Sequence, residues 1–427
     1  MWNYYKGQLL TTIRSQIFQN VSTVLGGNVL SRVVGFFSTW LLVRHLAPED
    51  YGIFSVLDMV AGLSVGFLTT GFNWSMIKTV ASYKDDPVKS WAIAFIVLKV
   101  EIVYGLFVAV VIYFSADFIA QVIFHKPELT FYLRLCSVGI LGSVLYNYRT
   151  SIYQAMMQFT RDAAFAIFNA VGYLLIILLL LLTGFFSIRT ISIFYVGLPI
   201  LISGVAIILL KRHFVKDPNT SSSKILNSMI KEYTWLLCYT LCLWFTGQFH
   251  MMILTRYVPM QEVGLYGFAY KFYGFSLILM YAINTVLLPT FSGIKDRESL
   301  RYAFQKVIKT VPKVALCYLF TIPFLGLFIE LIAGPRYAGA TAMLQILIFG
   351  AALSTTLSPT VNVLFALNKF KLIAIGGFFL VLANIIGNLT LTRNMGGNGA
   401  ALAQVGSHLI LGLWVTYHAF RLLYSKN

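Results

Sequence analysis

Four basic residues lie inside otherwise apolar segments that are long enough to cross a bilayer: Arg32, Lys99, Arg149 and Lys271. A charge that faces lipid is costly, so such residues usually face protein or water. Lys99 is close enough to a segment end for its ammonium to reach the interface. The other three outnumber the one deep carboxylate, Asp58, and guanidinium groups bind phosphate through forked donors. Arg32, Arg149 and Lys271 therefore predict a cationic, substrate-binding cavity, and Arg32 most directly because its own segment contains no carboxylate.

Two of these charges also have structural interpretations. Asp58 and Lys271 are expected at similar depths, where they either neutralise each other or leave Asp58 as an ion-coupling site. Arg149 either lines the cavity, caps main-chain carbonyls, or pairs with Glu101 or Asp162. The sequence alone is compatible with each of these alternatives.

Tyrosines accompany two of the charged segments. Tyr146 belongs to the polar run YNYRTSIYQ, and Tyr270 and Tyr273 flank Lys271. Their amphipathic rings could stack on sugars, although tyrosine also serves membrane interfaces and helix packing. Sugar contact and packing are both compatible with these positions.

The chain contains an internal repeat. The run RHLAPEDYG, bracketed by Arg44 and Gly52, returns as RYVPMQEVG, bracketed by Arg256 and Gly264, with residue numbers higher by 212. Further pairs keep this spacing: Gly184 with Gly396 at 212, and Ala155 with Ala366 and Phe159 with Phe370 at 211. A sustained offset indicates a duplication. Arg44 and Arg256 are expected to be outer-gate or packing residues.

The composition is that of a polytopic membrane protein. Hydrophobic residues make up 58% of the 427 residues and charged residues only 11%, far below the level of a soluble protein. Apolar runs broken by polar turns predict twelve helices, at about 17–43, 51–77, 91–114, 131–158, 163–183, 189–210, 233–255, 262–290, 310–332, 340–366, 371–392 and 399–420. A short amphipathic surface piece is expected at 115–130.

The net charge is +17, and most of the basic residues lie in short loops between apolar segments. This distribution is typical of a membrane protein's topology and does not indicate a nucleic-acid-binding surface. If the N-terminus is cytoplasmic, the cytoplasmic loops hold 21 of the 32 Lys and Arg, the opposite loops hold 7, and the four basic residues named first remain within the helices. The positive-inside rule then places both termini in the cytoplasm.

These features predict an all-α membrane protein with twelve transmembrane helices in two six-helix bundles. An even number of helices per half relates the bundles by a pseudo-twofold axis along the membrane normal. The expected parts are an interfacial segment at 1–16, an N-terminal bundle at 17–210, a cytoplasmic linker at 211–232, a C-terminal bundle at 233–421 and a cytoplasmic tail at 422–427.

No enzyme, cofactor or metal signature is present in the sequence. The histidines are scattered, and neither a zinc-protease motif, a nucleotide-binding glycine loop nor a nucleophile elbow occurs. The four cysteines lie within apolar segments, which argues against a disulfide framework. Gly62 and Gly66 form a G-x-x-x-G pattern, which is typical of close helix packing.

The run SRVVGF (residues 31–36) followed by LLVRHLAPEDYGIFSV resembles the polysaccharide-type lipid flippases, the Wzx group of the multidrug/oligosaccharidyl-lipid/polysaccharide exporter superfamily. The likeness covers the whole chain in length, helix number and repeat, and its most specific part is the R-x-L-x-P-E-x-Y-G turn. SRVVGF is also similar to the first helix of the peptidoglycan-precursor flippases, whose corresponding arginine lies in a cationic cavity, the position of Arg32 here.

The resemblance implies alternating access and transport of an undecaprenyl-pyrophosphate-linked oligosaccharide, such as an O-antigen unit of lipopolysaccharide, across the bacterial inner membrane. It further implies the lipid bilayer, the polysaccharide polymerase and chain-length machinery as partners, and H⁺ or Na⁺ as a coupling ion.

Two alternatives remain. A drug–cation antiporter of the same superfamily would need deep carboxylates in its first or seventh helix, where this chain has Arg32 and only Gln248 and His250. A membrane polysaccharide polymerase would be expected to carry large outer loops, and the outer loops here are short.

Overall fold

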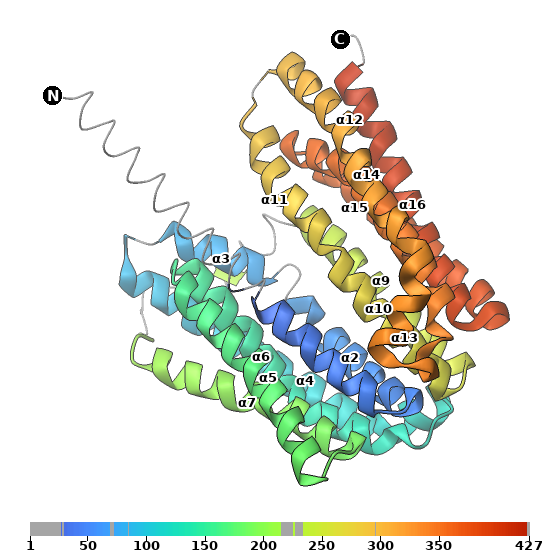
Figure 1. The fold of residues 1–427 in the computed structure, drawn as a ribbon. Helices are drawn as coiled ribbons and strands as arrows, with labels where there is room; N and C mark the ends of the chain where they lie inside the picture. The colour runs from blue at the N-terminus through green and yellow to red at the C-terminus, as the bar shows by residue number, and fades with distance from the viewer. Residues whose placement is uncertain are drawn as a thin grey trace. The chain divides into compact units, whose positions relative to one another are not determined.

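The structure is a computed structural model that describes residues 27, 30–68, 72–83, 85–214, 225–226, 234–294 and 296–424, and every regular element in these ranges is a helix (Figure 1). The predicted interfacial segment at 1–16, most of the predicted linker at 211–232 and the end of the predicted tail at 422–427 lie outside the described residues. The fold is therefore described from the helices between them.

Each of the twelve predicted helices has a helical counterpart in the described part of the chain. The N-terminal half contains helical residues 30–45, α2 (Pro48–Phe67), α3 (Asn73–Ser82), α4 (Pro87–Phe118), the π-helical turn η2 (Ile119–Ile123), α5 (Leu129–Ala155), α6 (Phe159–Thr183) and α7 (Ile188–Lys211). The C-terminal half contains α9 (Thr234–Tyr257), α10 (Met260–Ser276), α11 (Ile278–Ser292), α12 (Arg297–Thr321), η3 (Ile322–Phe324), α13 (Leu325–Ala333), η4 (Pro335–Tyr337), α14 (Ala340–Ala366), α15 (Phe370–Gly387), η5 (Asn388–Thr392) and α16 (Arg393–Tyr424).

The prediction of a separate surface segment at 115–130 was wrong for the first part of this range. Helix α4 continues through Phe118 and passes directly into η2, so its 32 residues extend about 48 Å and exceed the hydrocarbon core. Phe114, Phe118 and Val122 recur at four-residue spacing and are all exposed, which continues the apolar face of the helix. Asp117 is accommodated because it forms an ion pair with Arg134 at 2.6 Å.

Helix α12 begins at Arg297, well ahead of the start that apolar residues alone predicted. Asp296 is its N-cap, and its carboxylate accepts a hydrogen bond from the amide of Ser299 at 2.7 Å. This bond holds the pKa of the Asp296 carboxyl below its usual value. Cap chemistry therefore extends the helix ahead of residue 310, where the hydrophobic pattern starts.

The surface of the helices is that of a membrane protein. Among the described residues, nine helical stretches are long and apolar enough to cross a bilayer. Large apolar side chains face outward along them, including Phe107 and Phe114 on α4, Leu175 and Leu182 on α6, and Phe320 on α12. A water-soluble monomer rarely exposes such a continuous apolar surface. The chain is a multi-span membrane protein.

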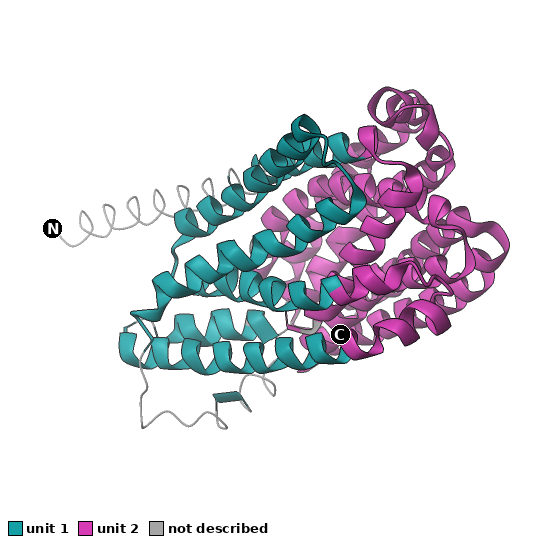
Figure 2. Cartoon of the chain, turned by 90° about the horizontal axis from the view of Figure 1, so that it is seen from below, with its two compact units in different colours: residues 1–42, 72–111, 135–230 teal, residues 43–71, 112–134, 231–427 magenta. Residues whose placement is uncertain are grey.

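The described chain divides into two compact units (Figure 2). Unit 1 comprises residues 1–42, 72–111 and 135–230, and unit 2 comprises residues 43–71, 112–134 and 231–427. Helix α2 thus belongs with the helices of the C-terminal half. The bundle boundaries predicted from the sequence, at 17–210 and 233–421, remain a prediction.

Each unit has its own core. In unit 1, Ile93 and Val97 of α4 pack with Ile152 of α5 and Leu210 of α7, and the Tyr148 hydroxyl donates a hydrogen bond to the Ala94 carbonyl at 2.8 Å. In unit 2, aromatic and branched side chains of α9, α11, α12, α14, α15 and α16 form the core, among them Tyr239, Phe291, Phe304, Val363, Leu380 and Val415.

The backbone confirms the duplication. The first residues of α2 and α10 differ by 212 in the numbering, and those of α5 and α14, like those of α6 and α15, differ by 211. Positions with positive φ repeat as well: Met157 (φ 56°) corresponds to Asn368 (φ 54°) at 211, and Gly184 (φ 75°) to Gly396 (φ 56°) at 212. These matches involve helix starts and backbone dihedral angles as well as apolar content, so a chance similarity between apolar segments does not explain them.

Within unit 2 the two copies of the repeated turn contact each other. A Cβ added to Gly52 of α2 would overlap the carbonyl oxygen of Met260, and one added to Gly264 of α10 would overlap that of Pro48. Pro48 and Met260 are themselves equivalent positions of the repeat, so each glycine meets the same backbone atom of the other copy. Only glycine permits this approach. One turn further along, Gly267 lies against the Ser55 side chain.

The G-x-x-x-G pattern of α2 has the packing role expected for it. Gly62 lies against the side chain of Gln248 of α9, and Gly66 lies against the Trp244 indole. The Trp244 indole also donates a hydrogen bond to the Gly62 carbonyl at 2.9 Å. Helix α2 therefore packs closely against both α9 and α10, and its glycines form these contacts.

We expect Gly264→Ala to lower the stability of the protein by about 1–3 kcal/mol, because its methyl group would force α2 and α10 apart. Gly274→Ala in the same helix is the matched control, since its Cβ would meet no atom within 4 Å. That control is expected to be neutral, or stabilising by up to about 1 kcal/mol. Thermal unfolding of the purified proteins in detergent measures both. Equal melting temperatures for Gly264→Ala and the wild type would contradict the close crossing.

Candidate functional site

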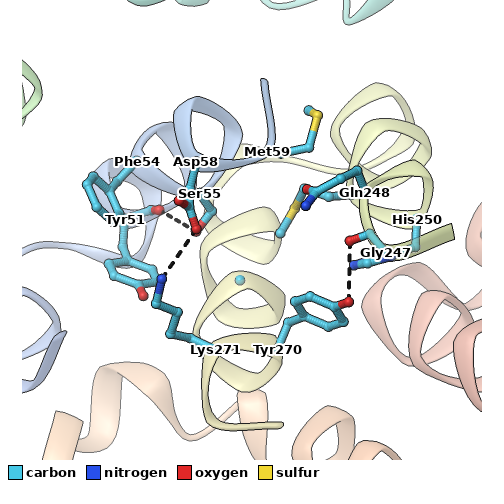
Figure 3. Close-up of a pocket in the computed structure, with 12 residues that line it drawn as sticks. Tyr51, Phe54, Ser55, Asp58, Met59, Gly247, Gln248, His250, Tyr270 and Lys271 are labelled. Atoms are coloured by element: carbon cyan, nitrogen blue, oxygen red, sulfur yellow. Dashed lines mark hydrogen bonds and ion pairs between the residues drawn. The ribbon is translucent and has the colours of Figure 1, made fainter. Parts of the chain in front are cut away.

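Helices α2 and α10 carry an ion pair just beyond their crossing. The Lys271 ammonium donates to the Asp58 carboxylate at 3.3 Å (Figure 3). The Lys271 and Asp58 side chains are 41% and 44% exposed, so solvent screens the pair. Of the alternatives left open by the sequence, mutual neutralisation is the arrangement observed here.

The pair lines a small cavity of about 70 Å³ between α2, α9 and α10 (Figure 3). The side of this cavity formed by α9 contains Gln248 and His250. His250 is fully buried, with Nδ1 3.0 Å from the Thr246 carbonyl, and its ring packs against Tyr270 at a centroid distance of 4.3 Å. Its Nε2 finds no hydrogen-bond partner among the described residues. The cavity thus combines a screened ion pair with a buried imidazole.

A larger cavity of about 470 Å³ lies next to the small one, and Tyr270 and Gly247 line both. Its polar lining consists of four tyrosines, three amides, two serines and one histidine: Tyr239, Tyr270, Tyr273, Tyr281, Asn284, Asn362, Gln404, Ser354, Ser358 and His408. None of the lining residues that the structure describes is Asp, Glu, Lys or Arg. Such a surface offers ring faces and neutral hydrogen-bonding groups, which suit a polar but uncharged ligand.

The amides of the larger cavity are held in place. Asn362 of α14 donates to the Asn284 side chain of α11 at 2.8 Å. Gln404 of α16 accepts from the Asn384 amide at 3.0 Å, and Asn384 also donates to Ser407 at 3.1 Å. These bonds fix the amide orientations before any ligand arrives. The sequence prediction included Tyr270 and Tyr273 but missed the amides, whose signal was their isolated occurrence in apolar helices.

Arg149 is fully buried within unit 1. Its guanidinium lies 3.6 Å from the Asp162 carboxylate and donates to Thr150 Oγ1 at 2.9 Å. The rings of Tyr146 and Phe165 cover it at 4.4 and 5.2 Å. Its Nε and Nη1 have no hydrogen-bond partner among the described residues. Pairing with Asp162 was one of the predicted alternatives, and Tyr146 contacts this arginine in the structure.

Arg32 is exposed on the helix formed by residues 30–45. Within the described part of the chain it makes no ion pair. Seven residues further along the same helix, Thr39 donates its hydroxyl to the Gly35 carbonyl at 2.9 Å. Arg32 and Arg149 belong to unit 1 and Lys271 to unit 2, so a cavity shared by all three remains a prediction.

The repeat-related arginines have different contacts. Arg256 donates from Nη1 to the carbonyls of Ile123 at 2.6 Å and Val122 at 3.1 Å, and so caps the carboxyl end of η2. The Arg44 side chain is exposed, and its main-chain carbonyl accepts a bond from Arg336 at 3.3 Å. Arg256 therefore acts in packing in this structure. An outer-gate role of either residue stays a prediction.

A family model described as polysaccharide biosynthesis protein matches residues 41–342. The chain belongs to this family of polysaccharide biosynthesis proteins. No curated protein matches the chain in a sequence search.

Solved structures share the fold of this polysaccharide biosynthesis protein. The lipid II flippase MurJ in an inward closed conformation has a TM-score of 0.74 at 16% identity, over 92% of this chain and 87% of that chain. An inward-facing multidrug resistance transporter of the MATE family has a TM-score of 0.74 at 14% identity, over 91% and 94%. A MOP superfamily transporter from Pyrococcus furiosus has a TM-score of 0.63 at 14% identity, over 95% and 94%. These likenesses confirm the all-α membrane fold and are consistent with twelve helices in two bundles.

In this polysaccharide biosynthesis protein, Asp162→Asn is expected to destabilise unit 1 by about 3 kcal/mol, because it leaves the buried Arg149 charge unpaired. The double variant Arg149→Met/Asp162→Asn should recover part of the loss. Asp117→Asn provides the matched control, since its pair with Arg134 is half-exposed and its loss should cost less than about 1 kcal/mol. Thermal or chemical unfolding in detergent compares the three. Equal losses for Asp162→Asn and Asp117→Asn would contradict the buried pair.

The Asp58–Lys271 pair should contribute little to stability because solvent screens it. In a double-mutant cycle with Asp58→Asn, Lys271→Gln and the combination, we expect a coupling energy below about 1 kcal/mol, decreasing further in high salt. A salt-independent coupling above about 2 kcal/mol would instead identify a desolvated structural pair.

Proposed function

We propose that the protein is a flippase that moves an undecaprenyl-pyrophosphate-linked oligosaccharide, an O-antigen or other surface-polysaccharide repeat unit, across the bacterial inner membrane by alternating access. Family membership supports a role in polysaccharide biosynthesis. The fold shared with a lipid II flippase supports the transport of a lipid-linked precursor rather than an enzymatic step. The termini would be cytoplasmic, as the charge distribution predicts.

The observation that carries the proposal is the lining of the larger cavity. An oligosaccharide presents hydroxyl groups and apolar ring faces, which match amides and tyrosine rings. Tyr270 and Tyr273 supply the rings, and Asn284, Asn362 and Gln404 supply neutral donors and acceptors. The cavity of about 470 Å³ is in the size range of ligand sites. The lipid tail would remain in the bilayer, since only the headgroup requires a polar route.

The pyrophosphate would be bound by the basic residues. Arg32 is the first candidate because it is exposed and makes no ion pair within the described ranges. Arg149 and Lys271 would have to exchange Asp162 and Asp58 for phosphate oxygens. Such an exchange conserves charge pairing, so it costs less than exposing an unpaired charge. The arrangement would couple ligand binding to rearrangement of the ion pairs.

Ion-coupled multidrug antiport is the second candidate. It is favoured by Asp58, a carboxylate that faces a small cavity in a fold shared with multidrug transporters. A cationic drug would need this carboxylate free, and Lys271 occupies it. The larger cavity, as far as its described lining shows, also lacks the negative charge that attracts cations. Export of a lipid-linked glycan is therefore the better fit.

Arg32→Ala is expected to reduce surface polysaccharide at least tenfold in a strain that lacks the chromosomal gene, while membrane insertion is unchanged. Lipid-linked oligosaccharide should accumulate on the cytoplasmic side, which extraction and mass spectrometry would show. Lys99→Ala is the matched control, because Lys99 is also basic and exposed but its ammonium lies over the Phe95 ring at 4.3 Å.

Full complementation by Arg32→Ala would count against the cationic site. A deletion strain that keeps its surface polysaccharide but gains sensitivity to cationic drugs would replace the flippase proposal with the antiporter.

A further inference from the structure

A third cavity, distinct from the two in unit 2, lies at one end of unit 1. It has a volume of about 290 Å³ and lies where the start of α6 meets the end of α7. Its lining combines the guanidinium groups of Arg161 and Arg212 with the ring of Phe165 and the side chains of Leu209 and Leu210. The positive-inside distribution predicts that this end is cytoplasmic.

The two arginines have donors to spare. Arg161 donates from Nη1 to the Gln158 side chain at 2.8 Å, and Arg212 donates from Nε to His213 Nε2 at 3.2 Å. Neither forms an ion pair within the described residues. A guanidinium has five N–H donors in a planar fork that matches phosphate oxygens. Most of this donor capacity is therefore open to an anion.

The described lining of the cavity contains no carboxylate, and the carboxylate next in the chain does not neutralise the two arginines. Asp162 follows Arg161 in the chain, but its oxygens lie 3.6 Å from Arg149 and 3.3 Å from the Gln154 amide. Arg149 itself does not line the cavity and lies 5.2 Å from the ring of Phe165, which does. The charge of Asp162 is thus matched by Arg149, and the two cavity arginines leave a net positive potential.

The surface below the arginines is apolar and faces outward. Leu209, which lines the cavity, is exposed, as are Ile208 on α7 and Phe168 on α6. At the same end Trp91 stacks on His213 with centroids 4.9 Å apart, and tryptophan is typical of the headgroup level of a membrane. A ligand here would meet cationic donors at the level of the headgroups and an apolar surface on the side of the acyl chains.

We propose that Arg161 and Arg212 bind the phosphate of an anionic membrane phospholipid, whose acyl chain lies along Leu209 and the adjoining exposed surface. Basic pockets between helices on the cytoplasmic side are suited to such headgroups. This site belongs to unit 1 alone and does not depend on the transported substrate. Its occupant would join the first turn of α6 to the last turn of α7.

The test is native mass spectrometry of the delipidated, full-length protein titrated with phosphatidylglycerol or phosphatidylcholine. We expect phosphatidylglycerol to bind at least tenfold more tightly, because choline neutralises the phosphate of the other lipid. Arg161→Gln/Arg212→Gln should weaken phosphatidylglycerol binding about tenfold or more, since two charge-assisted contacts are lost. Lys211→Gln is the control matched to a single arginine change: it removes one positive charge from a neighbouring exposed residue outside the cavity, and affinity should stay within about twofold.

The remaining arms identify the source of the phosphate. Glycerol 3-phosphate at millimolar concentration should not displace phosphatidylglycerol, because it lacks an acyl chain; full displacement would overturn the lipid assignment. Undecaprenyl pyrophosphate that competes more strongly than phosphatidylglycerol would assign the cavity to the substrate instead.

Thermal unfolding checks that the double variant is folded, and Arg212→Gln alone, beyond the end of α7, gives a second variant with an intermediate loss expected. Unchanged phosphatidylglycerol affinity in either folded variant would refute the proposal.

Discussion

A charged group inside a membrane is stabilised by an opposite charge or by water, and this requirement explains the two deep ion pairs of the chain. Arg149 faces Asp162 in unit 1, and Lys271 faces Asp58 in unit 2. The first pair is closed off from solvent, whereas the second is partly open to a cavity. The two pairs therefore differ in how readily they could exchange a carboxylate for another anion, and Arg32 is the deep cation that meets no carboxylate within the described residues.

The same requirement separates the polar surfaces of the two units. The larger cavity of unit 2 contains neutral amides and tyrosines, while the cavity at the end of unit 1 contains two arginines at the level expected for headgroups. Neutral donors at membrane depth cost less desolvation than charges do, and charges are tolerated where water and lipid phosphates reach them. Desolvation cost thus accounts for the neutral lining of the larger cavity, while the charges of the adjoining small cavity, Asp58 and Lys271, are paired and partly exposed.

Much of the fold was predictable because apolar run length and the repeat offset are properties of the linear chain. The offset paired Gly184 with Gly396, and both residues have a positive φ in the structure. It also brought Asp58 and Lys271 within one position of equivalence. The choice of Asp162 over Glu101 as the partner of Arg149 depends on helix rotation, which spacing alone does not determine. The contacts of Arg256 could not be predicted for a different reason. Its acceptors are main-chain carbonyls, which every residue carries, so the residue types do not indicate them.

The crossing of α2 and α10 has a further consequence for how the two copies of the chain relate. Gly52 and Gly264 each meet the equivalent carbonyl of the other copy, which is the geometry of an isologous contact in a homodimer. Because both copies belong to one chain, the contact is intramolecular and its formation does not depend on protein concentration. Unlike the two subunits of a homodimer, the two copies need not be identical beside the contact: Arg256 caps the end of η2, whereas the equivalent Arg44 is exposed.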